Sequence, residues 1–174
     1  MRRISLLVMV ASLAACAMAP TIPFSDADFR SYVGDGSSNL QGSAVLTTVA
    51  GGVRTCAGFP VLLAPATAYD REVVKLFGFE LNTAKRQAGP AAKYWRETNC
   101  DGAGNFVFND VPSGTWIVIT EASWTIQTAT QLPGAYKVSD QKQGGTMIGE
   151  VTLYSGKSAR FVMNDQNLKT IGLF

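Results

Sequence analysis

The residue types that carry most catalytic chemistry are sparse in this chain of 174 residues. The sequence contains no histidine, which excludes a Ser-His-Asp triad, a Cys-His dyad and a histidine-ligated metal site. Asp70 and Glu72 could act as a general acid and base, but acids near the start of a short helix more commonly stabilise its dipole. Gly156-Lys157-Ser158 has the order of a phosphate-binding loop, yet the partner glycine would fall on Val151. We therefore predict a non-enzymatic protein with no catalytic residue, cofactor or bound metal.

Cysteine chemistry of another kind is indicated at the N-terminus. Met1-Arg2-Arg3 precedes an uncharged run from Ile4 to Ala15, which is too short for a membrane-spanning helix of about 20 residues but suits a secretory signal. The run ends in Leu13-Ala14-Ala15-Cys16, which resembles the bacterial lipobox that directs lipid attachment and cleavage before the cysteine. The resemblance implies a signal peptide at 1–15 and a lipid on Cys16. The alternative is an ordinary signal peptide cut at Ala19, with Cys16 incidental.

Processing at Cys16 would also change the charge of the chain. Removing residues 1–15 takes away two arginines and no acid, so 13 basic and 13 acidic residues remain. A neutral chain has no general attraction for nucleic acid, which we do not expect as a partner. Ala17 stands where an aspartate would retain an enteric lipoprotein at the inner membrane. We thus expect an outer-membrane lipoprotein that faces the periplasm and has an envelope protein as its partner.

The other two cysteines form an even pair if Cys16 carries lipid. In an oxidising compartment, Cys56 and Cys100 are then expected to form a disulfide. Such a bridge would close a loop of about 44 residues and would stabilise the fold by about 4 kcal/mol in the chain-entropy model. The alternative is a pair of buried free thiols. A zinc site would lack ligands, because two thiolates without histidine leave the metal incompletely coordinated.

The rest of the chain predicts short β-strands joined by turns. Apolar and polar residues alternate from Leu40 to Val49, and Gly51-Gly52 ends this strand. Asp70 to Phe77 has early acids and is followed by a glycine, which predicts one short helix before a loop over 82–92. Residues 16–38 predict a tether, in which Ser25 and Asp28 could start a helical turn. Further strands are expected at 53–64, 93–99, 105–108, 115–124, 146–153 and 158–163, the last two as a hairpin, with a long loop at 125–143.

These elements predict an all-β domain over residues 39–174. We expect an antiparallel Greek-key β-sandwich of about seven strands, with a helical insertion at 66–92. Period-two alternation places Phe106 and Phe108 in the core and Val107 outside it. The same alternation separates two faces of the next strand, with Trp116, Val118 and Thr120 on one and Ile117 and Ile119 on the other.

One stretch of this domain resembles a known family. An Asp101-Gly102 turn, a Phe106-Val107-Phe108 strand, a Pro112-Ser113-Gly114 turn and a strand led by Trp116 follow one another. This series resembles the signature of carboxypeptidase regulatory-like domains, in the wider transthyretin-like and Cna-B group. The resemblance covers residues 39–163 apart from the insertion. It implies a β-sandwich but leaves the function open, because such modules serve as spacers, adhesion units and binding surfaces.

Two functions from different classes remain at this level. The first is a structural or interaction module, such as an accessory subunit of an envelope assembly. The second is a module that binds cell-wall glycan or peptide. For the second, Tyr94 and Trp95 are the candidate surface contacts, because adjacent residues of a strand point to opposite faces and one of them would lie outside.

Overall fold

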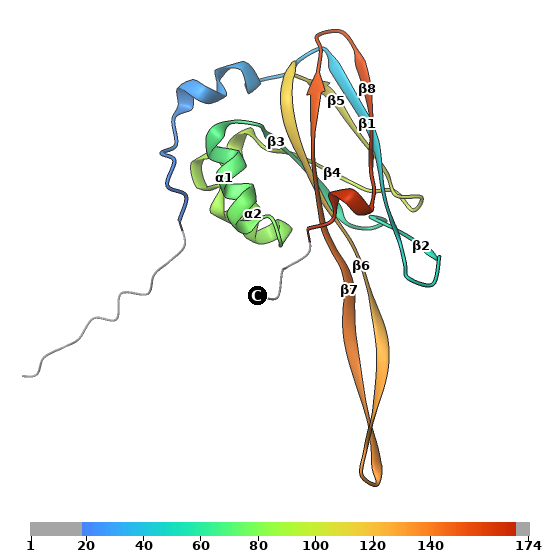
Figure 1. The fold of residues 1–174 in the computed structure, drawn as a ribbon. Helices are drawn as coiled ribbons and strands as arrows, with labels where there is room; N and C mark the ends of the chain where they lie inside the picture. The colour runs from blue at the N-terminus through green and yellow to red at the C-terminus, as the bar shows by residue number, and fades with distance from the viewer. Residues whose placement is uncertain (1–18, 170–174) are drawn as a thin grey trace, which may run out of the picture.

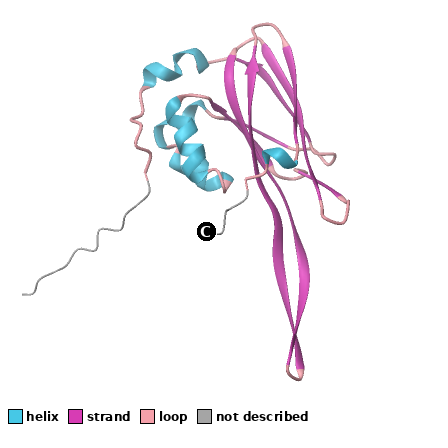
Figure 2. Cartoon of the chain, viewed as in Figure 1, coloured by secondary structure: helices cyan, strands magenta, loops and turns pink. Residues whose placement is uncertain are grey.

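The computed structural model describes residues 19–169 of the chain, so the predicted signal peptide and Cys16 lie outside the described residues. Two β-sheets pack face to face, and a helical layer covers the outer face of one of them (Figures 1 and 2). The predicted all-β sandwich with a helical insertion is confirmed. None of the helices in residues 19–169 is long and apolar enough to cross a membrane.

Sheet 1 is built around its first strand. It contains β1 (Ser38–Thr47), β2 (Val53–Thr55), β5 (Asn105–Val111) and β8 (Ser158–Met163). β1 pairs antiparallel with β2 and β5, but it pairs parallel with β8, from Asn39↔Ser158 to Ala44↔Met163. The prediction of a hairpin between residues 146–153 and 158–163 is therefore wrong. The Tyr154–Lys157 turn carries the chain from one sheet to the other, where β8 buries Met163 against the inter-sheet core.

Sheet 2 is antiparallel and carries the longest strands. It contains β3 (Pro60–Pro65), β4 (Arg96–Asn99), β6 (Gly114–Leu132) and β7 (Ala135–Leu153) in the order β4-β3-β6-β7. The predicted strand 53–64 is thus two strands in different sheets, β2 and β3. β6 and β7 stay in register along their whole length, from Gly114↔Leu153 to Leu132↔Ala135.

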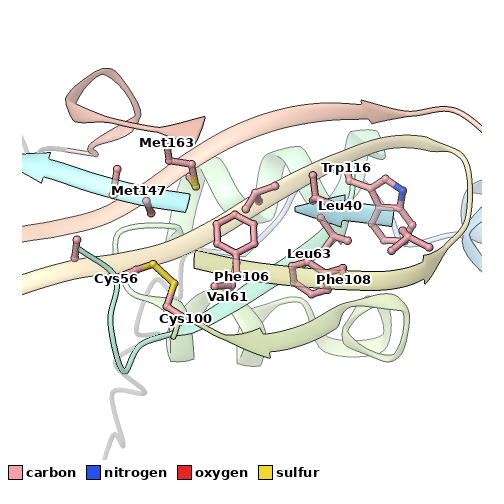
Figure 3. Packing of buried hydrophobic residues seen from close by; sticks show 14 of the residues in the cluster. Leu40, Cys56, Val61, Leu63, Cys100, Phe106, Phe108, Trp116, Met147 and Met163 are labelled. Atoms are coloured by element: carbon pink, nitrogen blue, oxygen red, sulfur yellow. A yellow bond between two sulfur atoms is a disulfide. The ribbon is translucent and has the colours of Figure 1, made fainter. Parts of the chain in front are cut away.

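The core between the sheets follows the predicted alternation. Phe106 and Phe108 are buried with Leu40 and Trp116, whereas Val107 is 45% exposed. Figure 3 shows the four buried side chains, Leu40, Phe106, Phe108 and Trp116, between the strands of the two sheets. The indole Nε1 of Trp116 donates to the Pro112 carbonyl at 3.0 Å, which satisfies the polar atom of the largest buried side chain.

The outer face of sheet 2 is covered by the insertion. The insertion forms α1 (Ala68–Phe77), α2 (Leu81–Gln87) and the 3₁₀-helix η2 (Gly89–Tyr94), and two further 3₁₀-helices are η1 (Asp26–Tyr32) and η3 (Asp165–Asn167). Ile117 and Ile119 of β6 lie beneath these helices, so the central strands are buried on both faces. The predicted loop at 82–92 is therefore wrong. Its small buried residues, Ala84, Ala88 and Ala91, let the helical turns lie close to the sheet.

Candidate binding surfaces

The predicted disulfide joins the two sheets. Cys56 follows β2 and Cys100 follows β4, and the two are bonded with their Cα atoms 5.7 Å apart. Both residues are buried in the inter-sheet core (Figure 3). Because the chain has three cysteines, residues 19–169 contain no free thiol for nucleophilic chemistry.

The two acids considered for acid–base chemistry have separate roles. Asp70 lies in the first turn of α1 and is fully buried, and this burial raises its pKa to about 7. One carboxylate oxygen, Oδ1, accepts from the indole Nε1 of Trp95 at 3.1 Å, and the other has no partner. Glu72 instead accepts from the Thr21 hydroxyl and the Ile22 amide. The pair forms no catalytic site, and no cluster of three metal-ligating side chains occurs between residues 19 and 169.

The candidate contact residues Tyr94 and Trp95 are not on one strand. Tyr94 ends η2 and Trp95 precedes β4, and Trp95 is only 9% exposed. The Tyr94 ring stacks on Phe29 with 4.6 Å between centroids, and its hydroxyl donates to Asp26 at 2.6 Å. The prediction that Trp95 is a surface contact is therefore wrong, because its side chain is buried and donates a hydrogen bond to the buried Asp70. Tyr94 serves to hold the N-terminal segment.

That N-terminal segment is bound to the domain over residues 21–32, which we call the strap. Glu72 accepts from Thr21 Oγ1 at 2.6 Å and from Ile22 N at 2.7 Å. Asp26 also accepts from Lys93 Nζ at 2.7 Å. Phe29 is fully buried in the core beneath the helices. The second half of the predicted tether is thus part of the folded body, and the helical turn expected near Ser25 is present as η1.

The most prominent surface is a two-stranded arm formed by residues 124–143. Here β6 and β7 continue beyond the sandwich as a paired hairpin (Figure 1). The prediction of a long loop at 125–143 is wrong. The segment has few apolar residues, and they do not alternate regularly with polar ones, because both faces of the hairpin are in water. Its Thr, Val and Tyr residues nevertheless favour a strand.

Apolar side chains are exposed along the arm. Ile126 is 38% exposed, Leu132 47%, Val138 61% and Tyr136 72%. Paired residues share a face of a hairpin, so the register puts Ile126 and Leu132 on one face and Val138 and Tyr136 on the other. The arm therefore offers apolar contacts on both faces and unpaired backbone groups along both edges.

Three contacts hold the base of the arm. Gly144 has φ +77°, and a Cβ at this position would lie 2.1 Å from the Ala122 carbonyl oxygen. Lys142 Nζ lies 2.5 Å from Glu121 Oε1 across the two strands. The guanidinium of Arg54 lies 5.8 Å from the centroid of the Trp124 ring, a cation–π contact that joins β2 to the arm.

A third surface is the outer face of sheet 1, which has no helical cover. A shallow hollow of about 450 Å³ lies on it, over β1, β5 and β8. Its lining combines two exposed valines with side chains that donate and accept hydrogen bonds, and these residues are Gln41, Ser43, Asn105, Val107, Arg160 and Val162. We call this hollow the open-face site.

Comparison with known proteins supports the fold. No family model and no curated protein sequence matches the chain. A crystal structure of a Pseudomonas aeruginosa protein, described as a candidate carbohydrate binding protein, is similar with a TM-score of 0.62 and 22% identity. The similarity covers 84% of this chain and 99% of that one. At this identity the match shows a common fold.

Proposed function

We propose that the chain is a bacterial envelope lipoprotein, anchored by lipid on Cys16, whose sandwich is a non-enzymatic docking module. The resemblance of Leu13-Ala14-Ala15-Cys16 to a lipobox supports the anchor. The resemblance of residues 101–118 to carboxypeptidase regulatory-like domains supports the class of module. The disulfide fits an oxidising compartment such as the periplasm.

The observation that carries the docking role is the arm. A two-stranded hairpin that projects into water is marginally stable by itself, and a long exposed edge invites pairing with another chain. Where β7 belongs to the sandwich, the chain after β8 covers its free edge. Lys169 N donates to the Thr146 carbonyl at 2.8 Å, and Leu168 forms a β-bridge with Met147. The arm beyond Thr146 lacks this cover among residues 19–169. A partner protein that adds a strand to the arm would complete it.

A shortened arm tests the docking role. In this variant, residues 127–140 are replaced by Asn-Gly, which closes the Ile126↔Gln141 pair with a two-residue turn. Chemical crosslinking in intact envelopes should give a defined adduct with the wild type and lose it with the short arm. Arg160→Ala, which alters only the open-face site, should keep the adduct. An unchanged crosslinking pattern in the short-arm variant would refute the arm as the docking surface.

A second candidate function, carbohydrate binding, is favoured by the open-face site. Amide, hydroxyl and guanidinium groups around an apolar patch are the chemistry that binds sugar hydroxyls. The similar Pseudomonas structure carries a carbohydrate-binding description, which supports this candidate. Calorimetric titration with soluble cell-wall glycan fragments should show binding that Arg160→Ala weakens and Lys157→Ala leaves intact. Carbohydrate binding at this site would be excluded if none of the fragments gave a heat of binding, or if both variants bound equally well.

A further inference from the structure

We infer that the helical layer is the side of the domain that faces the membrane. The inference rests on the proposed lipid at Cys16, and it concerns where the domain lies once that lipid is in the bilayer. Its basis is the strap, because the strap determines where the chain leaves the folded body.

The strap leaves only a short free connection. Thr21 is five positions after Cys16, and a fully extended chain spans at most about 3.5 Å per position. The acylated cysteine can therefore lie no more than about 18 Å from Thr21. Without the strap, the connection would run from Cys16 to β1 at Ser38, and the domain could turn any side to the bilayer.

The attachment of Thr21 to the helical layer is specific. The two bonds to Glu72 come from a hydroxyl and a backbone amide, so both carboxylate oxygens are used. These hydrogen bonds, above all that from Thr21, hold the pKa of Glu72 below its ordinary value. The carboxylate thus stays ionised and keeps the strap on α1 at neutral pH.

The surface beside this attachment suits a bilayer of anionic headgroups. A groove of about 440 Å³ lies between Thr21 and Ile22 of the strap and the exposed side of α1. Its charged lining consists of Arg71, Glu72 and Lys75. Arg71 pairs with Glu150 and Glu72 accepts from the strap, while Lys75 is exposed to solvent. The Lys75 cation would be attracted to an anionic leaflet, and this attraction favours the same orientation as the short connection.

The layered fold then determines how far the other surfaces lie from the bilayer. Packed layers are separated by about 10 Å, so the open face of sheet 1 lies about 20 Å farther from the bilayer than the helical layer. The arm extends β6 and β7 and runs in the direction of sheet 2, past the end of the helices (Figure 1). It would therefore extend along the membrane, where a partner in the same membrane can reach it.

Energy transfer to labelled lipids tests this orientation. The full chain, expressed with its signal peptide and purified in detergent, is reconstituted into vesicles that contain anionic lipid and an acceptor-labelled lipid. Donor dyes are placed one at a time on Asn82→Cys, at an exposed position of α2, and on Val162→Cys, at a position of the open face that is 54% exposed. The Asn82 position should show the greater transfer, since the helical layer lies about 20 Å nearer the acceptors.

Releasing the strap provides the matched variant. Glu72→Ala removes both bonds to Thr21 and Ile22, and the difference in transfer between the two positions should shrink. Glu80→Ala removes the same charge from the helical layer, where the Glu80 carboxylate accepts from the Thr83 hydroxyl and has no bond to the strap, and should leave the difference unchanged.

The outcomes separate the two proposals. Protein that fails to bind vesicles, with an unacylated N-terminus by mass spectrometry, would overturn the lipid anchor and the orientation with it. Acylated protein on vesicles with equal transfer at both positions, or more transfer at Val162, would overturn the orientation alone. A difference that Glu72→Ala leaves intact would show that the strap does not determine it.

Discussion

Replacing Asp70 by asparagine should stabilise the protein at neutral and alkaline pH. The Asp70 side chain is fully buried, and only one of its carboxylate oxygens has a hydrogen-bond partner, the indole of Trp95. Burial raises its pKa from an ordinary value of 3.8 to about 7, although the hydrogen bond from the Trp95 indole opposes the change. The folded protein therefore prefers the protonated, neutral acid.

The sign and size of the effect follow from linkage. Between pH 3.8 and about 7 the folded state holds a proton that the unfolded state has lost, so the free energy of unfolding falls as pH rises through this window. Above about pH 7 the loss is complete. Three pH units at 1.36 kcal/mol each correspond to about 4 kcal/mol. The carboxamide introduced by D70N would be neutral at every pH and could still accept from the Trp95 indole.

The assay is urea unfolding at pH 5, 6, 7 and 8, followed by tryptophan fluorescence. The chain has no histidine, so this window contains no imidazole titration that would obscure the result. Wild-type stability should decline across it, and D70N should show a flat profile with the greatest advantage at pH 8. Asp28→Asn, an exposed acid in η1, should follow the wild type. A wild-type profile without slope, or a D70N protein no more stable at pH 8, would refute the account of Asp70 as a buried acid.

Further predictions concern the disulfide, the arm and the anchor. Replacing Cys56 and Cys100 by serine should lower the free energy of unfolding by about 4 kcal/mol in urea, because the bridge closes a long loop; a loss below about 1 kcal/mol would contradict this chain-entropy account. Gly144→Ala should remove amide protection at the base of the arm, since its Cβ would meet the Ala122 carbonyl, while Gly156→Ala, also at positive φ but in open space, should cost only about 1–2 kcal/mol. Equal effects of the two glycine substitutions would argue against the steric reason. Mass spectrometry of the mature protein should find acyl groups on Cys16 with nothing before it, and a mature chain that begins at Ala17 or later would contradict the lipid anchor.

The sequence predicted the elements whose side chains alternate between water and a core. The strands around Phe106, Phe108 and Trp116 were predictable because each has a buried and an exposed face, or two buried faces with bulky residues. The Cys56–Cys100 bridge was predictable from the number of cysteines and the expected compartment. These are local signals, and the fold preserves them.

The elements that the sequence did not reveal depend on distant partners. The helices over 81–94 consist largely of small and polar residues, and their buried alanines acquire meaning only against sheet 2. The arm has no core at all, so it lacks the alternation that identifies a strand, and only its Thr-rich composition and the Pro133-Gly134 turn could have indicated a hairpin. Trp95 is buried in the core between the helices and sheet 2, where it donates to Asp70, which is 25 residues away in the sequence. Adjacent positions could not reveal this contact.

The parallel pairing of β1 and β8 has a mechanical consequence. The first and last strands of the sandwich run side by side in the same direction, in register from Asn39↔Ser158 to Ala44↔Met163. A pull that draws the start of β1 and the end of β8 apart would load all the bonds of this ladder in shear, so that they must break together. A hairpin pulled from its open ends would instead unzip one pair at a time. The sandwich is therefore built to resist traction between its terminal strands, a property that would suit the proposed lipid-anchored module.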